Sequence, residues 1–418
     1  MLRSALIISL VTALGCSSDV GDAGQRGSAS ASARAAALPT ISPSADLPSA
    51  RDMRAVGQGL VAKHECNRCH DGSGIAAAPT EKHCVSCHLD IAEDRFKASP
   101  AVLAEWKPHV THLRYAPSLS AVGSFVKPAW VTRYLLEPRD LRPYLHANMP
   151  RLQLDQSDAE AIAAFFASRE SAAPAKSSLA GDLERGRGLF TTKTCATCHQ
   201  YSGAGTPSPS AVSASAATQD RTLAPDLRFA RERLVFDRLA PYIADPKSVK
   251  PDAAMPKLAM SEQEAADLAK FVFEAPLSAP PEPIKPPRLP LLARPVGYDE
   301  VAEKILHKIC WHCHSQPDYA RGDGGPGNTG GFGFAPRKLD LASYESISSG
   351  YLDAQGERRS LFTPGPAGEP VLLEVLLARQ KEERGGHAEV RGMPLGLPSV
   401  SPEIIQLIET WIAAGHPR

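Results

Sequence analysis

Four short cysteine motifs constrain this chain more than any other feature of its sequence. Eight of its nine cysteines occur as C-x-x-C pairs, and a histidine directly follows each pair. The motifs are Cys66-Asn67-Arg68-Cys69-His70, Cys84-Val85-Ser86-Cys87-His88, Cys195-Ala196-Thr197-Cys198-His199 and Cys310-Trp311-His312-Cys313-His314. Any fold for the chain must therefore give four identical groups of side chains the same kind of role.

C-x-x-C-H is the attachment motif of c-type haem. The spacing lets both sulfurs reach the two vinyl groups of one porphyrin, and the adjacent imidazole then lies under the iron as proximal ligand. Disulfides would not explain the histidines, a zinc ribbon would use only the first two motifs, and a thioredoxin-like site needs a βαβ context that is missing. The sequence predicts four covalently bound haem c groups. They are attached through Cys66, Cys69, Cys84, Cys87, Cys195, Cys198, Cys310 and Cys313, with His70, His88, His199 and His314 as proximal iron ligands.

The N-terminus has the pattern of an export signal. Arg3 precedes the apolar residues 5–14, which are too few to span a membrane. They lead into Ala13-Leu14-Gly15-Cys16, which resembles the lipobox of bacterial lipoproteins with its first two residues swapped. We therefore predict a signal peptide over 1–16 and a lipidated Cys16 as the first mature residue; ordinary secretory cleavage is the alternative. The expected location is a bacterial membrane, facing the periplasm or the cell exterior.

Composition restricts the partners of the chain. Its 46 basic and 46 acidic residues give no net charge, which argues against nucleic-acid binding. No apolar run reaches the roughly 18 residues that span a bilayer. Residues 17–50 are rich in alanine, serine and glycine, which predicts a flexible tether, and the proline-rich residues 276–295 predict a stiff linker. Residues 325–330 fit G-x-G-x-x-G but lack the preceding strand and following helix of a nucleotide site, so no nucleotide is expected.

An internal repeat predicts the domain organisation. Each copy ends in an amphipathic helix, capped by Asp155 in the first copy and by a capping box of Ser261 and Glu264 in the second. The repeat predicts domains at 51–170 and 182–275, with the second haem motif inserted in the first domain, and a third domain at 296–418. The matching elements are Gly57-Gln58-Gly59-Leu60 and Gly186-Arg187-Gly188-Leu189, Ala116-Pro117 and Ala224-Pro225, and Met149-Pro150 and Met255-Pro256.

These residues resemble a known family. The first two domains are similar to small class I cytochromes c, which have a helix, C-x-x-C-H, a proline loop, a Met-Pro loop and a final helix. The third, which ends in the pattern from Met393-Pro394 to Gly415, is similar to planctomycete-type cytochrome c domains. The resemblance implies a mainly α fold of three tandem small cytochrome c-like helical domains with long loops.

The same resemblance implies distal iron ligands. They would be Met149, Met255 and Met393, each in a Met-Pro pair, and packing methionines are the alternative interpretation. The carbonyls of Pro117 and Pro225 would hold the proximal histidines in place.

The inserted motif departs from the family pattern because no fourth Met-Pro pair serves it. His112 or His109 is the tentative distal ligand of this haem. Exchange of ligands, in which Met149 serves the inserted haem, and an open iron site remain as alternatives.

The predicted function is transfer of single electrons between redox partner proteins, by a tetrahaem cytochrome held at a membrane through its lipid anchor. No catalytic residue is assigned. A haem enzyme, such as a peroxidase or a small-molecule reductase acting at the inserted haem, is the alternative because catalysis needs a vacant distal position.

Overall fold

The computed structural model describes residues 50–110, 112–145, 149–169, 177–209, 218–279, 287–315, 338–353, 355–384 and 388–418. The predicted signal peptide, Cys16, nearly all of the tether and the glycine-rich residues 325–330 lie outside these ranges. The described chain is mainly helical, as the sequence predicts.

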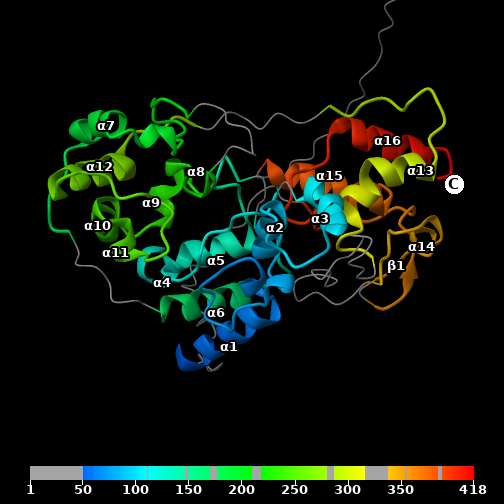
Figure 1. Ribbon diagram of the computed structural model, residues 1–418, viewed down its shortest axis with the longest axis horizontal. Coiled ribbons are helices and arrows are strands. Elements are labelled where there is room, and N and C mark those ends of the chain that lie inside the picture. The colour runs from blue at the N-terminus through cyan, green and yellow to red at the C-terminus, as the bar shows by residue number, and fades with distance from the viewer. Residues whose placement is uncertain are drawn as a thin grey trace, which may run out of the picture. The chain divides into compact units, whose positions relative to one another are not determined.

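The first region forms two long helices around a shared core. α1 and α6 pack against each other, and α5 covers α6 (Figure 1). Leu60, Val61, Ile162 and Phe166 are buried between them. The elements of this region outside the insertion are α1 (Ala50–Lys63), η1 (Cys66–Arg68), α4 (Val122–Phe125), α5 (Pro128–Leu136) and α6 (Gln156–Ala167).

The middle region repeats this plan. Its first long helix α7 packs against its last long helix α12, around the buried side chains of Phe190, Leu268 and Phe271 (Figure 1). Short helices connect the two. The elements are α7 (Leu183–Thr192), η4 (Cys195–Thr197), α8 (Gln219–Thr222), η6 (Leu227–Phe229), α9 (Ala230–Arg233), η7 (Phe236–Arg238), α10 (Leu239–Ala244), α11 (Pro246–Val249) and α12 (Glu262–Glu274).

One glycine in each repeat explains why the helix pairs approach so closely. A Cβ atom on Gly57 would lie 2.0 Å from the carbonyl oxygen of Ala161, and one on Gly186 would lie 2.1 Å from that of Asp267. Both carbonyls belong to the opposite helix, so neither helix can accept a side chain there. The second glycine of each G-x-G, Gly59 or Gly188, has open space around it.

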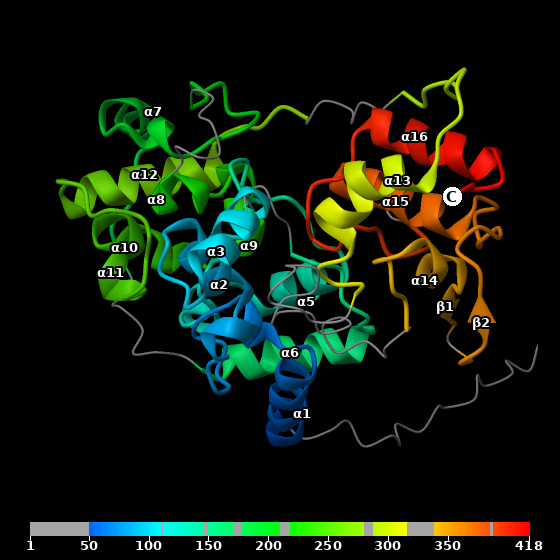
Figure 2. The ribbon, with the colours of Figure 1, turned by 45° about the vertical axis from the view of Figure 1, so that its right-hand side comes forward.

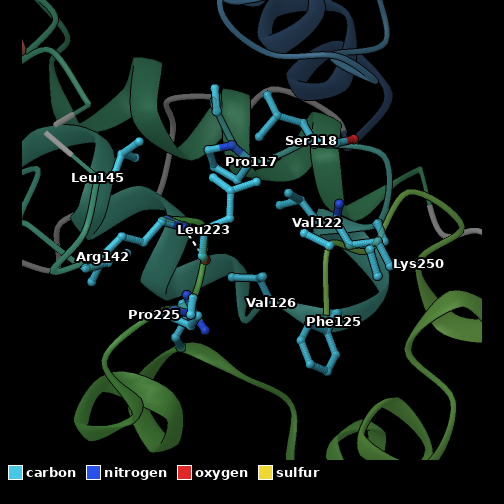
Figure 3. Close-up of a pocket in the computed structure, with 18 of the residues that line it drawn as sticks. Pro117, Ser118, Val122, Phe125, Val126, Arg142, Leu145, Leu223, Pro225 and Lys250 are labelled. Carbon is cyan, nitrogen blue, oxygen red and sulfur yellow. Dashed lines mark hydrogen bonds between the residues drawn. The ribbon is translucent and has the colours of Figure 1, made fainter. Parts of the chain in front are cut away.

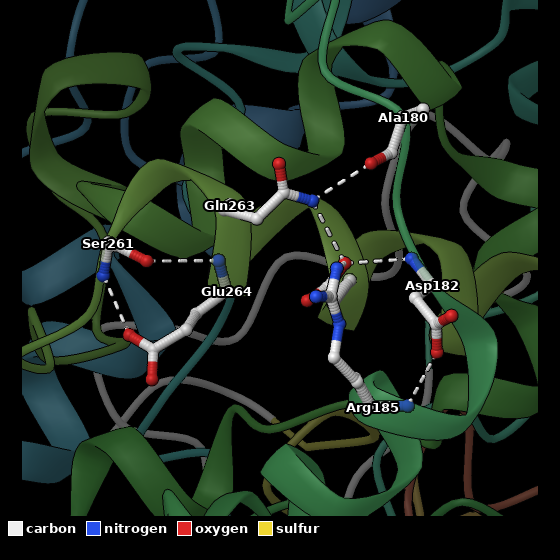
Figure 4. Close-up of polar contacts among 7 residues, drawn as sticks. Ala180, Asp182, Arg185, Ser261, Gln263 and Glu264 are labelled. Atoms are coloured by element: carbon white, nitrogen blue, oxygen red, sulfur yellow. Dashed lines mark hydrogen bonds and ion pairs between the residues drawn. The ribbon is translucent and has the colours of Figure 1, made fainter.

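The predicted helix caps are confirmed. Asp155 accepts a hydrogen bond from the backbone N–H of Asp158, and Ser261 and Glu264 form the reciprocal capping box (Figure 4). The buried carboxylate of Asp267 accepts hydrogen bonds from the Asp182 backbone at 2.7 Å and from the Arg185 guanidinium at 3.0 Å. This carboxylate therefore ties the start of α7 to α12.

The inserted segment has a small core of its own. Cys87, Ile91, Trp106 and Val110 are buried together, apart from the core of the first region. Ser99 caps α3, with Pro100 in its first turn. The elements are η2 (Thr80–Lys82), α2 (Cys84–Ala92), α3 (Pro100–Trp106) and η3 (Lys107–His109).

The C-terminal region packs around Trp411, which is fully buried. The helix that leads into the fourth motif begins as α13 (Tyr298–Val301) and continues as the π-helix η8 (Ala302–Cys310). Two short antiparallel strands lie beside α14 (Figure 2). The other elements are α14 (Tyr344–Ser348), β1 (Tyr351–Leu352), β2 (Arg358–Arg359), α15 (Val371–Glu383) and α16 (Pro402–Ala413).

The described ends of the proline-rich segment are fastened to the regions they adjoin. Ser278 N–H donates to the carbonyl of Gly203, and Arg288 forms ion pairs with Glu369 and Glu409. Residues 48–418 form one compact unit with a separate hydrophobic cluster in each predicted region. The domain limits at 51–170, 182–275 and 296–418 stay a prediction.

Candidate haem-binding sites

The first and third motifs leave their helices through the same turn. Glu65 and Thr194, the residues before the first cysteine, have left-handed backbones with φ of 51° and 59°. The backbone N–H of His70 then donates to Cys66 at 3.0 Å, and that of His199 to Cys195 at 2.9 Å. One tight turn thus brings each pair of thiols next to its imidazole.

Both imidazoles are oriented as the resemblance implies. His70 Nδ1 donates to the carbonyl oxygen of Pro117 at 2.7 Å, and His199 Nδ1 donates to that of Pro225 at 3.0 Å. Because a carbonyl oxygen only accepts, Nδ1 carries the proton and Nε2 keeps its lone pair. Burial lowers the pKa of both histidines, which favours the neutral form that binds metals.

One continuous cavity of about 520 Å³ serves both motifs. His70 and His199 line it together with the predicted distal ligands Met149 and Met255. Figure 3 shows Pro117 and Pro225 from the two repeats at its wall, with Val126 and Leu223 between them. The two candidate sites are therefore adjacent compartments of a single, largely apolar space.

The two repeats contact each other through matching residues. Lys127 N–H donates to the carbonyl of Arg233 at 2.8 Å, and Val235 N–H donates to that of Phe125 at 3.0 Å. Val126 and Leu234 face each other in this short antiparallel bridge. Residue 127 corresponds to 235, and 125 to 233, by the same offset that relates Pro117 to Pro225. The contact is therefore approximately two-fold symmetric.

A buried arginine, Arg233, a half-buried one, Arg142, and two tyrosines lie at this contact. Burial lowers the pKa of Arg233 to about 10, and the neighbouring positive charge of Arg142 lowers it further. Burial raises the pKa of Tyr134 to about 12 and also raises that of Tyr242. Within the described residues, neither guanidinium forms an ion pair with a carboxylate.

Such a donor set fits an anionic group. Arg142 donates through Nε to the Leu223 carbonyl at 3.0 Å, which leaves its terminal nitrogens for a ligand. Nε of Arg233 is buried without a hydrogen-bond partner. Because two neighbouring like charges that are largely withdrawn from water are costly without a counter-charge, the carboxylates of a porphyrin would stabilise this cluster. The residues present thus fit haem at both its iron ligands and its acidic edge.

None of these four side chains is among the site residues predicted from the sequence. Tyr134 and Tyr242 are separated by the same offset as Pro117 and Pro225, so extending the repeat would have paired them. Arg142 matches Lys250, another cavity residue, whereas Arg233 matches Phe125. A periodic signal therefore existed for the tyrosines but not for Arg233.

The inserted motif is built differently, because Cys84–His88 lies inside α2 rather than in a turn. His88 Nδ1 donates to the carbonyl oxygen of His112 at 2.9 Å. His112 thus has the position that Pro117 and Pro225 have for the other motifs, behind the imidazole and away from Nε2. This hydrogen bond argues against the prediction that His112 is the distal ligand of this haem.

The other predicted distal residue of the inserted haem, His109, ends η3, and its side chain is outside the described atoms. Its role stays a prediction. Met149 packs against the core of the first region and lines the cavity of His70. That placement is the one expected for a ligand of the first haem.

In the fourth motif, the His314 N–H donates to the Cys310 carbonyl at 3.1 Å, as in the first and third motifs. Cys310 and the predicted ligand Met393 pack against the same hydrophobic cluster. Burial lowers the pKa of His314. All eight motif cysteines are free thiols in the structure.

The first, second and fourth motifs converge. A hydrogen bond with the Cys69 thiol lowers the pKa of Cys84 to about 7. Cys313 is exposed as a residue, but desolvation of its thiol, followed by the nearby Cys84 thiol, raises its pKa to about 11. The rings of His88 and His312 have their centres 6.3 Å apart. Burial, together with the neighbouring His88, His112 and Arg68, lowers the pKa of His312 to about 4.

Comparison with known proteins gives one result, which agrees with this geometry. Residues 183–275 match the family model described as cytochrome c. No curated protein and no solved structure matches the chain. The middle region is thus a cytochrome c domain, and its family implies covalently bound haem c with iron and a role in electron transfer. Among the described residues, no helix is long and apolar enough to cross a membrane.

Proposed function

We propose that this chain is an exported, lipid-anchored tetrahaem c-type cytochrome that carries single electrons between redox partner proteins. The observation that carries the proposal is the shared cavity, in which two C-x-x-C-H motifs and two Met-Pro methionines face one space. The inserted and C-terminal motifs have the same residue types, and desolvation lowers the pKa of their proximal histidines, which favours the neutral form. Four equivalent sets of attachment residues support four haems.

Different residues of the chain would hold different parts of each haem. The cysteines bind covalently, the motif histidines and the Met-Pro methionines ligate, and the backbone carbonyls of Pro117, Pro225 and His112 fix the imidazole orientation. Arg142 and Arg233 would neutralise the acidic edges of the groups in the shared cavity. When bound, haem iron supplies one-electron redox chemistry. The apolar walls exclude water and thereby reduce the reorganisation that accompanies a change of charge.

The shared cavity also supports transfer along the chain. Because His70 and His199 line one space, their compartments are connected within a single cavity. The hydrogen bond between the Cys69 and Cys84 thiols brings the inserted motif next to the first, and the neighbouring rings of His88 and His312 bring the fourth motif next to the inserted one. We infer a connected path that touches all four sites.

The haem count is the first test. Purified holoprotein should carry four haems that resist acid–acetone extraction, measured by intact mass spectrometry. Replacing Cys195 and Cys198 with alanine should remove one haem and unfold the middle region, whose core surrounds that site. A mature wild-type protein with two or three haems would contradict the tetrahaem proposal. Peroxide turnover by the four-haem protein would favour the enzyme alternative over the carrier.

The lipid anchor has a separate test. Cys16→Ser should release the protein from the membrane fraction into the soluble exported fraction, because the acyl chains supply the binding energy. Ser17→Ala is the matched control and should leave the protein membrane-bound. If Cys16→Ser stays in the membrane fraction at both low and high salt, the lipid anchor is wrong.

A further inference from the structure

A histidine that belongs to the fourth motif lies beside the proximal histidine of the second. The ring centres of His312 and His88 are 6.3 Å apart, with an angle of 53° between the ring planes. His312 is the residue between the two cysteines Cys310 and Cys313, where the attachment motif leaves the residue type open. Its placement is therefore not explained by the attachment of its own haem.

The separation matches two imidazoles on opposite sides of one metal ion. A bond of about 2.0 Å from metal to imidazole nitrogen, with the ring centre about 1.1 Å beyond, gives ring centres about 6.2 Å apart. Rotation about the common axis is free, so an angle of 53° between the rings is compatible with such a pair. Direct ring packing at this distance is the alternative that the experiment must exclude.

The other described histidines near this site have different positions. His112 approaches His88 edge-on, with ring centres 5.9 Å apart, but its carbonyl occupies the Nδ1 side of His88. His307 Nε2 lies 3.1 Å from the Ala342 carbonyl, and its ring stacks on Trp311. His83 caps α2 by accepting from the Ser86 N–H. His312 is left as the described imidazole whose distance and contacts suit a second ligand.

We propose that His312 is the distal iron ligand of the haem attached at Cys84–His88. The inference rests on the proposed function, because it requires that this motif carries haem. This assignment gives the inserted haem a second iron ligand, which no Met-Pro pair in the sequence supplies. It also makes the C-terminal region supply an essential group to the first region, so that the site would be incomplete without both.

The test uses the full-length holoprotein and three variants. Carbon monoxide binds a ferrous haem only where the sixth position is vacant. We expect wild type to bind none, and His312→Ala to bind one equivalent and to show one high-spin ferric haem in four. Added imidazole should return that haem to the low-spin state. His109→Ala and His307→Ala are the matched controls and should resemble wild type.

A fourth variant checks that the result with His312→Ala is not caused by failed maturation of the fourth haem. His312→Met keeps a ligand, and it should increase the far-red sulfur-to-iron band from three haems per molecule to four. The proposal is overturned if His312→Ala stays fully low-spin, if wild type binds carbon monoxide, or if His109→Ala opens the site instead. The haem count of the same wild-type preparation shows which claim fails, the proposed function or the assignment of His312. Fewer than four haems contradicts the proposed function, whereas four haems with an unresponsive His312→Ala contradicts this inference alone.

Discussion

The glycine at the crossing of α7 and α12 gives the sharpest test of the fold. A Cβ on Gly186 would lie 2.1 Å from the carbonyl oxygen of Asp267 and 2.7 Å from its carbonyl carbon. To remove this clash, α7 and α12 would have to move apart by about 1 Å across the buried Phe190 and Phe271. Overpacking of this kind costs about 1–3 kcal/mol. Because backbone atoms cannot rotate away, we expect Gly186→Ala to lower the free energy of unfolding by about 2–3 kcal/mol.

The control is the second glycine of the same G-x-G motif, two residues further along the chain. Gly188 is exposed and has open space around it, so Gly188→Ala should raise stability by about 0.5–1 kcal/mol through helix propensity alone. Guanidinium unfolding of the holoprotein, followed by circular dichroism, should place the midpoints of the two variants roughly 1 M apart. Equal midpoints, or a less stable Gly188→Ala, would refute the close crossing.

Two further predictions concern charged groups. Arg142→Leu should lower the midpoint potentials of the haems near His70 and His199 by tens of millivolts in a spectroelectrochemical titration. The reason is that a unit charge roughly 10 Å away contributes about 1–2 kcal/mol at an effective dielectric constant of about 20; unchanged potentials would argue against the shared anionic site. Burial alone would raise the pKa of Asp267, but hydrogen bonds from the Asp182 backbone, Gln263 and Arg185 outweigh it and lower the pKa. This carboxylate therefore stabilises the fold above about pH 4 and loses that contribution as pH falls through its folded pKa. Asp267→Asn should be less stable at neutral pH and should lose less stability on acidification, and an unchanged acid transition would count against this network.

Local patterns in the sequence predicted local structure well. The capping box at Ser261 needs only neighbouring residues, and the structure confirms it. The repeat predicted that Pro117 and Pro225 would play the same part, and both carbonyls accept from their histidines. Each of these features depends on a few side chains whose spacing is visible along the chain.

Contacts between regions could not be predicted in this way. Nothing in the spacing of residues shows that Lys127 would pair with Arg233, because the bridge uses backbone groups that every residue has. His112 was considered for its side chain, whereas its carbonyl makes the contact with His88. The sequence pattern assigns His312 only to its own motif. In all three cases the deciding fact is which surfaces meet, and that depends on the whole packed chain.

The two-fold bridge between the repeats affects which amino-acid substitutions the two repeats can accept independently. In a homodimer, symmetry forces every substitution to appear on both sides of the interface. Here one chain carries both halves, so the partner's effective concentration is fixed by the connection and does not fall on dilution. Arg233 already faces a chain whose matching residue is Phe125. A substitution in one repeat can therefore change the charge environment of that repeat alone. The contact between the two repeats stays intact.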